Sequence, residues 1–138
     1  VFKETGMFQP DLQRVKNMIG SMEDHEFLLR VCRSGKHGLY TPDMISTTHI
    51  EPERLTKAYH RRWHTGHGHF YAVLADPDWE RSKFRLADVP AHLLKETATN
   101  AFKWLSRMLT GKIDAAFVNE CRLRFFSGFF WQRRRQSS

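Results

Sequence analysis

Two adjacent carboxylates, Glu23 and Asp24, stand at the front of a short amphipathic segment, MEDHEFLLRV, at residues 22–31. A carboxylate held beside an acceptor hydroxyl can take its proton while the oxygen attacks, which is general-base catalysis. Acids in the first turn of a helix also interact favourably with the helix dipole, by about 0.3–1 kcal/mol each. Neighbouring residues on a helix point about 100° apart, so one acid would be the base and the other would bind or orient a neighbour.

A second group with possible chemistry is a cluster of histidines that crowd into one stretch: His60, His64, His67 and His69. His60 and His64 are four residues apart, the spacing that chelates zinc on one face of a helix. However, Arg61 and Arg62 stand between them, where a metalloprotease helix would carry a glutamate. We therefore favour a solvated or phosphate-facing basic helix over a zinc site.

The same stretch contains Tyr59, Arg62 and Trp63. An arginine can grip diphosphate oxygens in a bidentate manner, and a tryptophan offers a flat face to a sugar ring or a base. The structural alternative is an interfacial helix in which Trp63 is buried and Arg62 faces water.

Near the end of the chain, aromatic residues precede a basic cluster: Phe125, Phe126, Phe129, Phe130 and Trp131, then Arg133, Arg134 and Arg135. This combination suits the surface of a membrane with anionic lipid. The alternative is a core helix with a charged tail. A nucleic-acid site is less favoured, because the aromatics are bunched together and no recognised binding motif is present.

Composition and charge limit the class of protein. The chain has 138 residues, 41% of them hydrophobic, and carries a net charge of +7. The basic excess lies in residues 51–138, which suggests an anionic partner.

No apolar run reaches the roughly 18 residues that span a bilayer, and the first residues do not resemble a signal peptide. The missing initiator methionine suggests a fragment, and we expect Cys32 and Cys121 to be reduced and buried.

The pattern predicts mostly helical elements. Helices are expected from Ser21 as N-cap to Gly35, from Pro52 to a break at Gly66 and Gly68, from Asp88 and Pro90 to Gly111, and from Asp114 onward. Two short extended pieces are expected at 38–41 and 44–50. Residues expected to share helix faces are Phe27, Leu28 and Val31; Leu55, Tyr59 and Trp63; and Leu94, Thr97, Ala98, Ala101, Leu105 and Met108.

Four pieces of the sequence, taken in order, resemble the C-terminal part of a family 2 (GT-A fold) glycosyltransferase. They are VFKETGMFQPDL, GSMEDHEFLLRVCRSG, GLYTPDMISTTHI and RLTKAYHRRWHTG. The resemblance implies the acceptor-side part of a GT-A-like catalytic domain at residues 1–68 and a helical, membrane-leaning extension at 69–138. The implied fold class is α+β and predominantly helical.

The resemblance also implies residue roles. Asp24 matches the aspartate of the family's ED motif, which looks like the base that deprotonates the acceptor, and Glu23 is its motif neighbour. His49 matches a histidine that in some members lies near the metal and the diphosphate.

Arg62 and Trp63 are similar to the last two residues of the QxxRW motif of processive members. Tyr59 stands where that motif has glutamine, so the resemblance does not extend to processive synthesis.

The nucleotide-binding half of that family, with its DxD motif, has no counterpart in these residues. We therefore expect the intact enzyme to bind the nucleotide-sugar donor and its Mg²⁺ or Mn²⁺ elsewhere, and this chain alone to be inactive and to bind no cofactor. The expected acceptor is a glycan or a lipid-linked molecule, with no nucleic-acid partner. The expected location is the cytoplasmic, inner face of a membrane, as a peripheral protein. The alternative is a non-enzymatic membrane-surface or interaction module that uses the basic aromatic helix.

Overall fold

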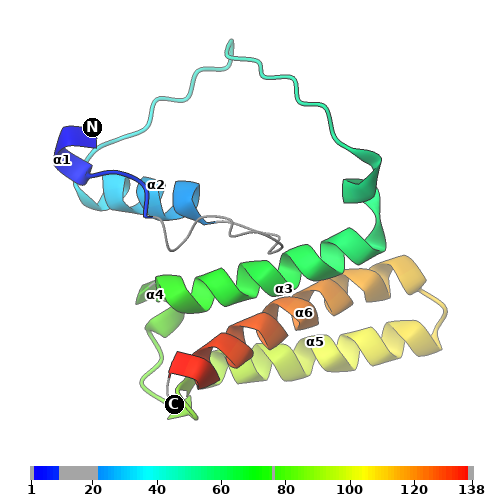
Figure 1. Ribbon diagram of the computed structural model, residues 1–138. Coiled ribbons are helices and arrows are strands. Elements are labelled where there is room, and N and C mark those ends of the chain that lie inside the picture. Colours follow the sequence, from blue (N-terminus) through cyan, green and yellow to red (C-terminus); the bar gives the residue numbers. More distant parts are fainter. Residues whose placement is uncertain (1, 10–21, 76, 137–138) are drawn as a thin grey trace.

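The computed structural model describes residues 2–9, 22–75 and 77–136 (Figure 1). The described part is mostly helical, as predicted, with one two-stranded antiparallel hairpin, and it does not by itself identify a GT-A fold. In the described residues no helix is both long enough and apolar enough to cross a membrane.

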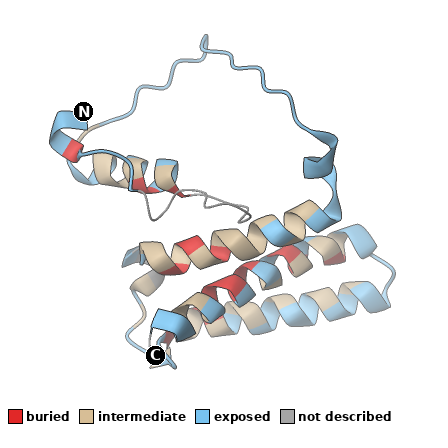
Figure 2. Cartoon of the chain, viewed as in Figure 1, coloured by how far each residue is buried: buried red, intermediate tan, exposed pale blue. Residues whose placement is uncertain are grey.

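The central feature is a layer of three long helices in which α6 (Ile113–Gln136) lies between α3 (Lys57–Leu74) and α5 (Ala91–Leu109) (Figure 1). Because α6 is covered on two sides, its apolar residues are spread around the helix instead of forming one stripe. Phe125, Phe126 and Phe129 are buried in the core between the helices. Figure 2 shows the buried positions concentrated along α6 and the facing side of α3.

Helix α3 follows a 3₁₀ turn, η2 (Pro52–Leu55), and the hydroxyl of Thr56 caps it by accepting a hydrogen bond from the Tyr59 backbone N–H at 3.2 Å. The helix expected from Pro52 is divided: the 3₁₀ turn begins at Pro52, but α3 begins only at Lys57, so the exposed Leu55 does not share a helix face with Tyr59 and Trp63. The break expected at Gly66 and Gly68 was wrong, since the helix continues to Leu74. The boundary expected between residues 68 and 69 falls inside this helix.

One of the two glycines at which a break was expected, Gly68, lies where α3 crosses α6, and Gly128 of α6 lies at the same crossing. A Cβ atom added to Gly68 would lie 1.9 Å from the carbonyl oxygen of Phe125, and one added to Gly128 would lie 2.0 Å from the carbonyl oxygen of Thr65. The two helices therefore approach so closely that their backbones touch at these positions. Here glycine is required by the contact between the helices and does not end α3.

Helix α5 packs on α6 through one face, on which Leu93 is buried. On the same side Arg107 donates to the Asn119 side-chain oxygen at 2.6 Å, and the Asn119 amide donates to Asn100 at 2.9 Å. The face that contains Leu105 and Met108 points away, and both side chains are exposed. The predicted apolar stripe of α5 therefore packs only at its beginning, where Leu94 lies against the core, whereas Leu105 and Met108 stay exposed.

A hairpin of β1 (Arg85–Leu86) and β2 (Val89–Pro90) precedes α5 and was not predicted. Arg85 pairs with Pro90 and Leu86 with Val89, and both turn residues, Ala87 and Asp88, have positive φ angles, which suits a tight hairpin turn. Helix α5 consequently begins at residue 91, after the hairpin, and not at Asp88.

Charged side chains fasten the hairpin to the end of α6. Arg85 donates to Glu80, the last residue of the short helix α4 (Pro77–Glu80), at 2.6 Å and to the Asp88 carboxylate at 2.9 Å. Arg133 of α6 also pairs with Glu80.

A smaller unit contains α1 (Phe2–Thr5) and α2 (Glu23–Arg33). Gly35 follows α2 with φ of +76°, which confirms the predicted C-terminal glycine. Met22 occupies the N-cap position, and the expected cap Ser21 lies outside the described residues. The predicted apolar face is wrong at Leu28, which is exposed.

The segment between α2 and η2 contains the two predicted extended pieces, 38–41 and 44–50, but no strand forms in it. Tyr40 and Ile45 are 86% and 87% exposed. A strand needs a neighbouring strand for its hydrogen bonds, and the described residues place none beside this segment. Of the two cysteines, Cys121 is buried as expected, whereas Cys32 is exposed.

The close crossing of α3 and α6 gives the first prediction. Gly68→Ala should lower the free energy of unfolding by about 1–3 kcal/mol or more, because the helices must separate to admit the methyl group. Urea denaturation followed by circular dichroism measures this change. Gly38→Ala is the control, since its added Cβ meets no atom within 4 Å. Equal stability of the two variants would show that the helices are not in backbone contact.

Candidate functional site

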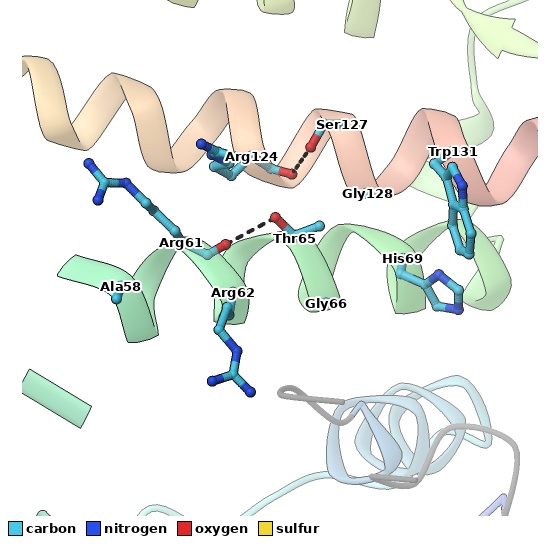
Figure 3. Close-up of a pocket in the computed structure, with 10 residues that line it drawn as sticks. All are labelled: Ala58, Arg61, Arg62, Thr65, Gly66, His69, Arg124, Ser127, Gly128 and Trp131. Carbon is cyan, nitrogen blue, oxygen red and sulfur yellow. Dashed lines mark hydrogen bonds between the residues drawn. The ribbon is translucent and has the colours of Figure 1, made fainter. Parts of the chain in front are cut away.

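A groove of about 890 Å³ runs between α3 and α6 (Figure 3). The lining residues recur at helical spacing on both helices: Ala58, Arg61, Arg62, Thr65, Gly66 and His69 from α3, and Arg124, Ser127, Gly128 and Trp131 from α6. The groove exists because the glycine-mediated crossing leaves only small residues along its floor.

Two of the three arginines of the groove are held by one carboxylate. Arg61 forms a bidentate pair with Glu120, at 2.6 and 2.9 Å, and Arg124 lies 3.6 Å from the same carboxylate. The hydrogen bond from Arg61 is the main reason why the pKa of Glu120 is lowered. Both guanidinium groups are therefore oriented before any ligand arrives.

Arg62 differs from these two arginines. It is exposed, no hydrogen bond or ion pair links it to another described residue, and Figure 3 shows its side chain extending away from α6. Its charge is available to an anionic ligand, and the same exposure fits the structural alternative in which Arg62 faces water. The exposed guanidinium of Arg62, together with those of Arg61 and Arg124 that Glu120 holds, can bind phosphate or diphosphate oxygens.

The other end of the groove is aromatic. The indole of Trp131 lies 5.4 Å from the His69 ring, and the guanidinium of Arg135 lies 4.8 Å from the indole centroid. Burial, and after it the charge of Arg135, lowers the pKa of His69, which favours its neutral form. This end can receive an uncharged ring or chain next to the cationic end.

Trp63 and Tyr59, the partners predicted for Arg62, are not among the residues that line the groove. Trp63 stacks on His67 with centroids 4.1 Å apart, and Tyr59 lies edge-on to His60 at 5.9 Å. The structure thus places these three residues on one helix but does not direct them into one cavity.

The four clustered histidines lie against aromatic rings and do not converge. His60 contacts Phe117, His64 and His67 contact Trp63, and His69 contacts Trp131. In the described part of the chain, no group of three or more histidine, cysteine or acidic side chains is arranged to hold a metal ion. The zinc alternative therefore finds no support in the geometry.

The paired acids occupy the first turn of α2 and face different surroundings. Asp24 is exposed, whereas Glu23 is half-buried, and its Oε2 atom is buried with no hydrogen-bond partner among the described residues. The two side chains thus differ in exposure, and which of them faces a ligand stays a prediction.

Arg30 fixes this helix to the beginning of the chain. Its guanidinium is bidentate with buried Glu26, at 2.9 and 2.8 Å, and also donates to the backbone carbonyls of Thr5 and Met7. The Phe27 ring lies 5.1 Å from that of Phe2. The residues that precede and follow the undescribed 10–21 are thus joined in one packed unit.

His49 lies in the segment of residues 36–51, which Figure 1 shows arching away from the three-helix layer. Its side chain is exposed. The structure does not bring it together with Asp24 or Arg62.

Arg124 and Trp131 are the site residues that the sequence did not assign to this groove. The sequence held one signal for them: Arg124 and Trp131 are seven residues apart, as are Arg62 and His69 of α3. It could be used only after the two helices were known to lie side by side.

No protein-family model, curated protein or solved structure matches this chain. A function must therefore be inferred from the residues themselves.

The packed histidines predict a dependence of stability on pH. Burial is the main reason why the pKa of His67 is lowered, followed by the charge of His25. An unfolded histidine has a pKa of about 6.5, so the unfolded chain binds more protons as the pH falls below that value. The contribution of neutral His67 is complete above about pH 6.5 and is lost as the pH falls toward the folded pKa.

His67→Phe keeps a ring between Trp63 and Tyr71 and removes the proton site. Its free energy of unfolding should fall less than that of the parent between pH 7 and pH 5, as measured by urea denaturation at each pH. His37→Asn, at an exposed position after α2, is the control. Parallel curves for the parent and His67→Phe would rule out the proposed linkage.

Proposed function

We propose that this chain is the acceptor-side and C-terminal portion of an inverting family 2 (GT-A fold) glycosyltransferase. The observation that supports it best is the set of hydrogen bonds that Arg30 donates to Glu26 and to the backbone of Thr5 and Met7. Arg30 joins two of the sequence pieces that carry the resemblance, ETGMF and EDHEFLLR, into one packed unit. The accessible carboxylate of Asp24 stands on the first turn of that unit.

In the proposed reaction Asp24 takes the proton of the acceptor hydroxyl. The acceptor oxygen forms a bond to the anomeric carbon, and the bond from that carbon to the diphosphate oxygen breaks with its electron pair. The configuration at the carbon is inverted, and the nucleoside diphosphate leaves. Asp24 suits the role of base because a helix N-terminus holds a carboxylate firmly and Asp24 remains open to solvent.

Arg62 would bind the diphosphate, since its charge is free and exposed. In this proposal Trp63 and Tyr59 remain candidate substrate-binding residues, and His49 keeps the place near the metal and the diphosphate that the resemblance implies. The described residues do not offer a ligand set for Mg²⁺ or Mn²⁺, because His49 lacks neighbouring ligands. In this proposal the cation and the nucleotide-sugar donor belong to a nucleotide-binding half outside this chain.

We further propose a glycan or lipid-linked acceptor and a peripheral position on the cytoplasmic face of a membrane. The alternative of a membrane module built on the aromatic residues of α6 is weakened, because Phe125, Phe126 and Phe129 are buried in the core.

The role of Asp24 can be tested in the intact enzyme, meaning this chain joined to its nucleotide-binding half. Asp24→Asn should reduce the turnover of sugar transfer about 10²- to 10⁴-fold, the usual contribution of a general base. The affinity for the donor, measured by calorimetry, should change little. Asp43→Asn, an exposed acid outside the site, is the control and should keep full activity. Unchanged turnover of Asp24→Asn would refute the assignment.

The proposal that sugar transfer needs a nucleotide-binding half outside this chain can be tested separately. The 138-residue chain alone should transfer no sugar from a radiolabelled nucleotide-sugar, because this proposal assigns the donor and cation sites to the nucleotide-binding half, and the described residues hold no group of three or more histidine, cysteine or acidic side chains arranged for a metal ion. Detectable transfer to any acceptor by the chain alone would overturn this part of the proposal.

A further inference from the structure

Helix α5 forms the edge of the three-helix layer, and α6 covers it from one side (Figure 1). The face toward α6 is occupied by Leu93 and by the polar contacts of Asn100 and Arg107. The opposite face therefore has no helix over it in the described part of the chain.

That opposite face, which we call the α5 outer face, is apolar over most of the helix. Its residues share one side at helical spacing: Ala98, Ala101, Phe102, Leu105, Met108 and Leu109. Phe102 and Leu109 are 74% and 80% exposed, and Leu105 and Met108 are 51% and 43% exposed. Four large side chains exposed on one helix face are more than the scattered apolar residues of an ordinary surface.

Along α5 and in the turn that follows it, the exposed charges without an ion pair to another described residue are lysines. Lys95, Lys103 and Lys112 are exposed, and no ion pair joins them to another described residue. Glu96 is the one acidic residue of α5, and its carboxylate is held by Arg122 of α6 at 2.9 Å. A partner that binds the α5 outer face is therefore next to unpaired lysines and to no unpaired carboxylate of α5.

We propose that the α5 outer face binds the surface of a membrane that contains anionic lipid, with α5 lying in the plane of the interface. An apolar stripe bordered by lysines is the pattern of an interfacial amphipathic helix. The lysine stems can extend along the acyl boundary while their ammonium groups reach the phosphates. The membrane contact thereby belongs to α5, and not to the aromatic stretch of α6 that the sequence pointed to.

A second copy of the chain is a less suitable cover. A two-fold interface brings the same patch of both copies together, so the lysine borders of the two stripes would face each other. Like charges held close in such an interface oppose association, whereas an anionic lipid surface attracts them.

The test uses the complete 138-residue chain and sedimentation with vesicles of phosphatidylcholine that contain about one third phosphatidylglycerol. The parent chain should bind these vesicles and bind pure phosphatidylcholine at least about tenfold more weakly, since charge contributes to the affinity. Binding should also weaken as salt is added.

Three variants separate the outcomes. Phe102→Ser with Leu105→Gln and Leu109→Gln should lower the partition coefficient at least about tenfold. Replacing Lys95, Lys103 and Lys112 by Gln should remove most of the preference for phosphatidylglycerol. Tyr40→Ser with Met44→Gln and Ile45→Gln is the matched control, because it removes three apolar groups elsewhere that are more exposed than those of α5, and its binding should equal that of the parent.

Undiminished binding of the α5 variant, or an equal loss in the control, would overturn the proposal. Sedimentation equilibrium without vesicles supplies a second readout. A dimer of the parent chain that the α5 variant loses, with no vesicle binding by the parent, would show that a second copy covers this face. Since the readout is lipid binding and not sugar transfer, its result does not depend on the proposed transferase.

Discussion

The approach of α3 to α6 is the constraint on which most of the described structure depends. Gly68 and Gly128 allow the two backbones to touch, so the helices lie closer than larger side chains would permit. This closeness places the phenylalanines of α6 against both neighbouring helices. It also leaves the shallow groove in which the arginines and Trp131 gather. The core and the candidate ligand groove are thus two results of one contact.

Local signals in the sequence predicted the helices well, because helix ends are set by neighbouring residues. Pro52, Gly35 and Gly111 stand where such signals place them, and the structure begins or ends helices beside them. The hairpin at 85–90 was missed because strands of two residues leave no periodic pattern. The two glycines of α3 were misread because the reason for Gly68 lies in Phe125, which is distant in the sequence.

The candidate site was predictable only where one element supplies it. Arg62 and Asp24 were selected as candidates from the motifs of the resemblance, and their roles remain proposals. Arg124 and Trp131 belong to the same groove through tertiary packing, which composition does not encode. The aromatic run of α6 shows the same limit, since a buried helix and a membrane-surface helix share one composition and differ in what lies next to them.

The central position of α6 has a consequence for how the chain acquires its structure. On the ribosome, α3 and α5 are both synthesised before the helix that supplies their main packing surface. Until residues near Phe129 emerge, the residues of α3 and α5 that pack against α6, such as Ala72 and Leu93, lack that partner, and the nascent chain must keep them from associating wrongly. A premature stop before Phe125 would therefore leave these earlier helices without the phenylalanines of the core, even though every residue of their own sequence is intact.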